Sequence, residues 1–223
     1  MVESPDHVLD MNLDELRDAL APRLAVHAAF DGWDEQAIAM AAAELGVSAD
    51  RARLAFPGGA AQMIDAWFDA IDKAMLIAFP PERIAALKIR ERIRDLILFR
   101  LEMVAPQREA LRRALSVLAM PQNALHGARL AWRSADRIWR LAGDTATDFN
   151  HYSKRALLIG VYASTTLVFL DDQSDGLADT RTFLDRRIGD VMRIEKAKAR
   201  WQGNSQYRPS LSRFLGRLRY PAV

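Results

Sequence analysis

The chain has 223 residues, half of them apolar, so it is long enough to bury a sizeable core in one domain or two small ones. It contains no cysteine, which excludes disulfides, thiolate catalysis and thiolate metal sites. The formal net charge of +2 is unevenly distributed: residues 1–75 carry five basic and fourteen acidic side chains, a net of −9, and residues 76–223 carry twenty-six and fifteen, a net of +11. We therefore expect anionic partners to meet the second part of the chain.

Neither a membrane-spanning segment nor a targeting signal is evident. Arg, Lys or Asp interrupts every apolar stretch before it reaches the roughly 18 to 20 residues that a spanning helix needs. Residues 1–20 contain six acidic residues and one Arg, which is typical neither of a signal peptide nor of a transit peptide. We expect a cytoplasmic protein.

The apolar residues recur at intervals of three and four, and no sustained alternation predicts a strand. The expected class is therefore all-α, a bundle of about ten helices. The first three span about 12–30, 34–45 and the short segment opened by Ser48, which ends at the sequence Phe56-Pro57-Gly58-Gly59. The later helices are expected at 60–78, 81–104, 106–118, 121–141, 148–170, 177–201 and 210–219, with residues 202–206 as a tether before the last.

Residues 37–56 have the layout of a helix-turn-helix, with Gly46 at the turn. A DNA-reading helix needs basic side chains free to neutralise phosphates. The short helix offers only Arg51 and Arg53, beside Asp50, in a region whose net charge is −9. This charge opposes binding to nucleic acid and favours a unit that serves only to pack.

The stretch 155–170 is apolar on nearly every face, which predicts a central helix. Such a helix belongs to the core, and it also suits the wall of a ligand cavity. The sequence leaves both alternatives open, because the residues that line a cavity and those that fill a core are chemically alike.

The predicted helix 121–141 carries a second stripe beside its apolar one, formed by Arg129, Arg133, Arg137 and Arg140 and opposed only by Asp136. Two interpretations remain open. The stripe is a solvated face, or it receives an acidic partner or lipid phosphates.

The last predicted helix is amphipathic and basic. Its apolar residues fall at i, i+3, i+4 and i+7, and arginines lie on the other side. Such a short helix should fold only when its apolar stripe finds a surface, which is a bilayer, a partner or the protein's own core. The residues concerned are Leu211, Phe214, Leu215 and Leu218, with Arg213 and Arg217 opposite.

No catalytic motif is present: there is no nucleophile elbow, no phosphate-cradling glycine loop and no His-Glu-x-x-His. Asp148 and His151 lie a helical turn apart, but a di-iron bundle needs further inward carboxylates and a second such pair. None of these is present, and an N-cap at Asp148 explains the same residues better. We expect no enzymatic activity, no cofactor and no metal.

Two blocks carry a family resemblance. Residues 147–158 read TDFNHYSKRALL, and residues 183–192 begin with FLDRRI and end with DVM. Both are similar to blocks of the ubiquinone (coenzyme Q) biosynthesis accessory family often called Coq-nine, as is the sequence FPGG at 56–59. The resemblance covers about residues 34–200.

The resemblance implies a TetR-like helical fold, commonly dimeric, that has lost DNA reading and holds a lipid or isoprenoid quinone. It further implies that the protein presents membrane quinone intermediates to a di-iron demethoxyubiquinone hydroxylase, and that its C-terminal helix engages an anionic membrane surface. The chain would then divide into an acidic helix-turn-helix-like unit (1–56), a lipid-binding domain (57–201) and a membrane-binding tail (202–223). The rival hypothesis is a TetR-type ligand-responsive repressor on the same scaffold.

These implications assign residues to three surfaces. We expect the lipid to contact Leu101, Val104, Trp139, Leu158, Val161, Tyr162 and Thr165. The hydroxylase is expected at Asp148, Phe149, Asn150 and Tyr152. Many relatives carry Trp where this chain has His151, so either the partner contact is altered or the partner differs. The membrane is expected at Leu211, Arg213, Phe214, Leu215, Arg217 and Leu218.

Overall fold

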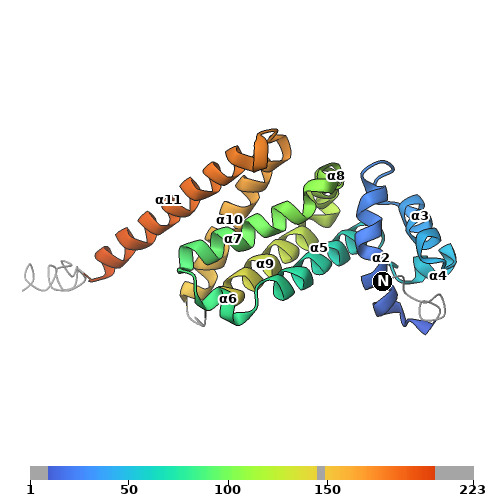
Figure 1. Cartoon of the computed structure of the whole chain (residues 1–223), viewed down its shortest axis with the longest axis horizontal. Helices are drawn as coiled ribbons and strands as arrows, with labels where there is room; N and C mark the ends of the chain where they lie inside the picture. Colours follow the sequence, from blue (N-terminus) through green and yellow to red (C-terminus); the bar gives the residue numbers. More distant parts are fainter. Residues whose placement is uncertain (1–9, 145–148, 204–223) are drawn as a thin grey trace, which may run out of the picture. The chain divides into compact units, whose positions relative to one another are not determined.

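The computed structural model describes residues 10–144 and 149–203, giving only the backbone for 149–150 and 194–203. Within these ranges it contains helices and no strand (Figure 1), so the predicted all-α class is confirmed. The α-helices are α2 (Leu13–Ala28), α3 (Glu35–Leu45), α4 (Ala49–Leu54), α5 (Gly59–Ala78), α6 (Pro81–Ala85), α7 (Ile89–Val104), α8 (Arg108–Ala119), α9 (Ala124–Leu141), α10 (Phe149–Asp171) and α11 (Ala178–Gly203).

The chain forms two compact units, residues 1–184 and 185–223. The first contains α2 to α10 and the start of α11, so the predicted boundary after residue 56 lies inside it. In the second, Asp190 of α11 forms ion pairs with two neighbouring arginines, with Arg187 at 2.7 Å and with Arg193. The predicted helix 210–219 lies outside the described residues.

The first three helices begin and end at residues suited to capping. Asn12 and Glu15 form a reciprocal capping box at the start of α2, with hydrogen bonds of 2.8 to 3.0 Å. The side chain of Asp34 caps α3, and Gly46 ends it with φ of +71°, a left-handed conformation that favours glycine. Ser48 then caps α4.

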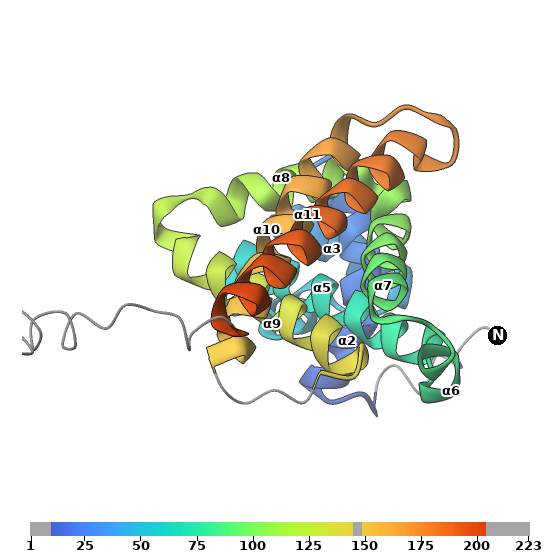
Figure 2. The same ribbon diagram turned by 90° about the vertical axis from the view of Figure 1, so that its left-hand side faces the viewer.

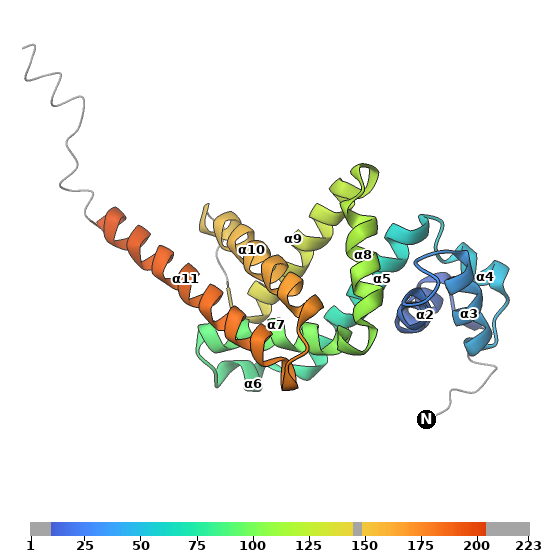
Figure 3. The same cartoon turned by 90° about the horizontal axis from the view of Figure 1, so that it is seen from above.

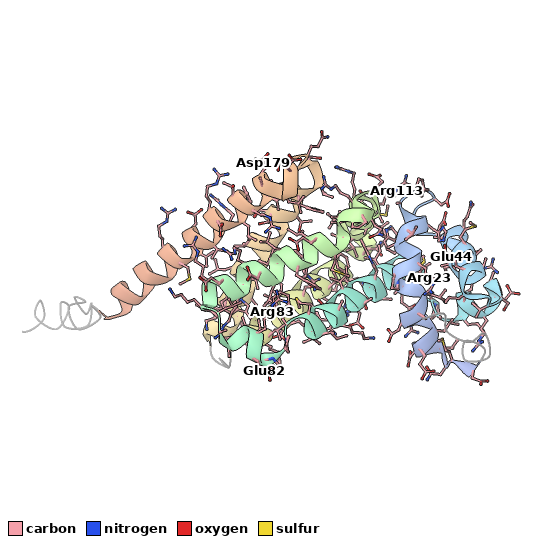
Figure 4. All side chains as sticks on the ribbon, in the orientation of Figure 1. Arg23, Glu44, Glu82, Arg83, Arg113 and Asp179 are labelled. Carbon is pink, nitrogen blue, oxygen red and sulfur yellow. The ribbon has the colours of Figure 1, made fainter. Side chains whose placement is uncertain are left out.

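This N-terminal group is fixed to the rest of the first unit by α2, which packs against α3, α5 and α8. Arg23 of α2 and Glu44 of α3, both labelled in Figure 4, lie 3.8 Å apart. The buried indole of Trp33 donates to the carbonyl of Ala110 in α8 at 3.0 Å, and its ring centre lies 5.3 Å from that of Trp67 in α5. The helix-turn-helix-like group therefore shares a core with α5 and α8.

The single helix expected at 81–104 is two helices, α6 and α7, so this part of the prediction is wrong. Arg92 stabilises the break, because its guanidinium donates to the carbonyl of Leu87 at 2.8 Å and to that of Ala142 at 2.9 Å. The backbone N–H of Lys88 donates to the Glu91 carboxylate at 2.9 Å and so starts α7. The Leu87 carbonyl, which the longer helix would have paired internally, is bonded by a side chain instead, and the Ala142 carbonyl ties that side chain to the end of α9.

The core of the first unit lies between α5, α7 and α9, which pack against one another (Figure 2). Seen from above, α9 lies between α8 and α10 (Figure 3), and it contacts both. Fully buried side chains of this core include Ile64, Met75, Leu96, Leu101 and Ile138. A cleft lies where α8, α9 and α10 meet this core.

Candidate functional site

A cleft of about 450 Å³, partly open to solvent, lies between α8, α9 and α10, with Phe68 of α5 also contributing to its wall. Thirteen of its sixteen lining residues are apolar; the others are Ser134, Tyr162 and Thr166. No carboxylate, imidazole or ammonium group lines it. Its volume is within the roughly 300 to 1,000 Å³ of small-molecule sites, and its walls suit a hydrocarbon.

Small residues on α9 create this space. Ala124, Gly127, Ala128 and Ala131 fall at i, i+3, i+4 and i+7, so they form one stripe of the helix, and all four line the cleft. Opposite them α8 contributes larger apolar residues, among them Leu111, Leu115 and Leu118. A Cβ on Gly127 would meet the carbonyl oxygen of Leu118 at 3.2 Å, so glycine allows α9 to approach the end of α8 closely.

Two of the polar side chains in the cleft are bonded to a buried arginine. Arg100 of α7 has no exposed surface; its Nη2 donates to the Ser134 hydroxyl at 3.0 Å and its Nε to the Tyr162 hydroxyl at 3.2 Å. Asp72 of α5, equally buried, forms an ion pair with Arg100. A buried arginine needs such a partner, because an unpaired charge in the interior is strongly destabilising.

The arginine stripe predicted on α9 finds its acidic partners within the chain. Arg133 lies 2.7 Å from Asp65, and Arg137 lies 2.8 Å from Asp69 and 2.5 Å from Asp72, all on α5. Burial alone would raise the pKa of Asp69, but hydrogen bonds from Arg137 and Lys73 outweigh it and lower that pKa. Opposite charges on facing helices therefore join the acidic first part of the chain to its basic second part.

The stripe continues to Arg140, which pairs with Asp136 at 2.6 Å within α9. Asp136 also accepts a hydrogen bond from Arg155 of α10 at 2.7 Å. Burial raises the pKa of Asp136, but Arg155 and Arg140 outweigh this effect and lower it. Three of the four arginines in the stripe therefore form ion pairs with aspartates of the same chain.

Of the seven residues predicted to contact lipid, Tyr162 lines the cleft. Five others, Leu101, Val104, Leu158, Val161 and Thr165, are buried outside its lining, and Thr165 donates to the Val161 carbonyl at 2.7 Å. Trp139 is half-buried and donates to the Lys154 carbonyl at 3.0 Å. The sequence-based prediction did not include the residues of α8 and α9 that line the cleft. The stripe of small residues on α9 was a sequence signal that could have indicated them. Lipid contact at the seven residues stays a prediction.

The predicted hydroxylase surface is described in part. Asp148 lies outside the described residues, and Phe149 and Asn150 begin α10. Tyr152 is 60% exposed, and its ring centre lies 5.9 Å from that of Trp132 and 5.0 Å from that of His151. An aromatic cluster with one exposed member, Tyr152, therefore marks the start of α10.

The six residues predicted to bind membrane, Leu211, Arg213, Phe214, Leu215, Arg217 and Leu218, lie outside the described residues. Among the helices that are described, none is long and apolar enough to cross a bilayer. No group of three or more potential metal ligands occurs in residues 10–144 and 149–203.

Residues 124–195 match the model of the COQ9 family, a range that covers α9, α10 and much of α11. The mitochondrial ubiquinone biosynthesis protein COQ9 of Rattus norvegicus is 34% identical over 169 residues, which are 73% of this chain and 54% of that protein. The chain belongs to the COQ9 family, as its sequence blocks predict. COQ9 of Homo sapiens is 32% identical, over 73% of this chain and 53% of its own length. The chain thus spans about half the length of the curated COQ9 relatives it matches.

A solved structure shares the architecture. A TetR transcriptional regulator from Nitrosomonas europaea superposes with a TM-score of 0.63 and 27% identity, covering 78% of this chain and 96% of its own. The predicted TetR-like fold is therefore confirmed. The COQ9 relatives are named as mitochondrial, whereas our sequence-based expectation for this chain is the cytoplasm.

Proposed function

We propose that this chain is a non-catalytic accessory protein of ubiquinone biosynthesis, which holds a lipid or isoprenoid quinone in the cleft between α8, α9 and α10. The single observation that carries the proposal is this cleft of about 450 Å³, whose lining is apolar except for three hydroxyls. An apolar cavity of even ~150 Å³ binds a benzene-sized guest. The names of the COQ9 relatives support the pathway.

The role we propose is binding and presentation without chemistry. General acid–base catalysis needs a carboxylate, an imidazole or a similar group in contact with the substrate. The lining offers only the side chains of Ser134, Tyr162 and Thr166. Two of these are bonded to a buried arginine and the third to a backbone carbonyl, so none has a neighbouring base that would activate it.

The ligand is proposed to pass to a di-iron demethoxyubiquinone hydroxylase, which docks at Asp148, Phe149, Asn150 and Tyr152. The exposed ring of Tyr152 supports this surface, because aromatic side chains are enriched at protein interfaces. Membrane attachment is proposed for the basic amphipathic segment 210–219, on anionic lipid. We also propose a homodimer, on the family resemblance alone.

A ligand-responsive repressor is the second candidate, favoured by the likeness to a TetR regulator. The short helix α4 argues against it. Arg51 donates to the Met11 carbonyl at 2.5 Å, and Arg53 pairs with Asp50 at 2.6 Å and Glu35 at 3.5 Å. Both arginines would have to leave these partners to neutralise DNA phosphates.

The cleft is tested by blocking it. Ala163 of α10 is exposed and lines the cleft, whereas Ala43 of α3 is also exposed but does not line it. We expect Ala163→Phe to lower the lipid recovered by mass spectrometry from organic extracts of purified protein, and Ala43→Phe to leave it unchanged. The unsubstituted protein should gain about 2.7 kcal/mol of stability at a quinone concentration of ~100 Kd. The proposal would be refuted if the purified protein contained no lipid and its melting temperature did not change when quinones were added.

A further inference from the structure

The two hydroxyls at the arginine end of the cleft have unused hydrogen-bonding capacity. A guanidinium has donors and no acceptor, so Ser134 and Tyr162 accept from Arg100 through their oxygens. Each hydroxyl then retains one hydrogen to donate. Among the described residues no acceptor is found for either hydrogen, whereas Thr166 donates to the Tyr162 carbonyl at 2.9 Å. Two O–H donors therefore remain in an otherwise apolar cleft.

Charge near these hydroxyls is balanced. The connected network brings three positive charges, on Arg100, Arg137 and Lys73. It brings three negative charges, on Asp72, Asp69 and Asp18, joined to the cations by ion pairs at 2.5 to 3.1 Å and by the buried Arg100–Asp72 pair. An added carboxylate or phosphate would find no uncompensated cation here and would lose its hydration. The two donors therefore suit an uncharged acceptor.

Building on the proposed function, we infer that Ser134 and Tyr162 donate hydrogen bonds to a neutral carbonyl oxygen on the ligand head, while the alanine and leucine walls hold its hydrocarbon tail. Arg100 positions both hydroxyls and takes no part in contacting the ligand. The site thus selects a long-chain carbonyl compound, such as an alkyl quinone, over a hydrocarbon and over a fatty acid anion. Specificity of this kind comes from polar groups that are left unpaired when the wrong ligand is bound.

Three probes of equal chain length test this selectivity in the unmodified full chain by isothermal titration calorimetry: heptyl-1,4-benzoquinone, heptylbenzene and 4-heptylbenzoate. One neutral hydrogen bond is worth about fivefold in affinity, so the quinone should bind about 25-fold tighter than heptylbenzene. It should also bind tighter than the benzoate. If the quinone and heptylbenzene bind equally, the inference is wrong and the proposed function stands. If none of the three binds, the proposed function fails, and the inference with it.

Variants assign the selectivity to the two hydroxyls. Ser134→Ala and Tyr162→Phe should each reduce the preference for the quinone about fivefold and leave heptylbenzene binding unchanged. Ser164→Ala is the matched control, because its hydroxyl lies on α10 outside the lining and donates to the Gly160 carbonyl at 2.7 Å. Circular dichroism checks that each variant is folded. If the two variants lost affinity equally for the quinone and for heptylbenzene, the hydroxyls would stabilise the fold and not contact the ligand, which would overturn the inference.

Discussion

The buried ion pair between Arg100 and Asp72 offers a quantitative test of the structure. Both side chains have no exposed surface, and Arg137 also pairs with Asp72 at 2.5 Å. Asp72→Ala leaves Arg100 buried without a carboxylate, which costs about 3 to 5 kcal/mol in comparable cases. For a chain of this size each kcal/mol shifts the melting temperature by about 2 to 4 °C, so we expect a drop of roughly 6 to 20 °C.

Thermal denaturation and urea denaturation, both followed by circular dichroism, measure the melting temperature and the free energy of unfolding, with Asp14→Ala as the control. Asp14 pairs with Arg17 at 2.6 Å, but its side chain is 86% exposed, and exposed pairs contribute about 0 to 1 kcal/mol. The double variant Asp72→Leu with Arg100→Met should recover about 2 kcal/mol relative to Asp72→Leu alone, because no lone buried charge remains. Equal unfolding free energies for Asp72→Ala and Asp14→Ala would refute the reasoning.

Three further predictions concern other parts of the chain. Asp172 is buried and accepts four hydrogen bonds of 2.5 to 2.9 Å from Ser174 and Thr180. Burial alone would raise the pKa of Asp172, but these hydrogen bonds outweigh burial and lower it. The carboxylate therefore stabilises the fold fully above its unfolded-state pKa, and this stabilisation is lost as the pH falls. Asp172→Asn should therefore cost about 2 to 3 kcal/mol at neutral pH and flatten the decline in denaturation free energy below about pH 5; an unchanged slope would contradict this. Truncation after Gln202 should abolish flotation with anionic liposomes while circular dichroism shows nearly the same helicity, and equal flotation would place membrane contact elsewhere. Gel shifts with genomic DNA fragments at low salt should show no band, and a retarded, salt-sensitive band would favour the repressor.

Local sequence signals predicted most of the fold. Asn12, Asp34, Gly46 and Ser48 act locally as caps or turn residues, and helix boundaries near them were correctly predicted to within a few residues. The break between α6 and α7 was not predictable in this way. It depends on Arg92 reaching a carbonyl fifty residues away in sequence, which only the tertiary structure brings close.

The site was harder to predict than the fold. An apolar helix face that lines a cleft has the same composition as one that fills a core, so most predicted lipid contacts on α10 fell on the buried face next to the cleft lining. The alanine and glycine stripe on α9 was the informative signal, because small residues leave space between helices. Similarly, the sequence of α9 predicts a surface with charges of one sign, because the matching aspartates belong to α5, which is distant in sequence but adjacent in the structure.

The pairing of α5 with α9 also sets an order of events during synthesis. Asp65 and Asp72 meet Arg133 and Arg137, which are 68 and 65 residues later in the chain. Since ribosomes add about 5 to 20 residues per second, these arginines are made about 3 to 14 s after their partners. A nascent chain thus exposes an acidic helix until more than half of the protein has been translated, and the packing of α5 against α9 has to be completed late.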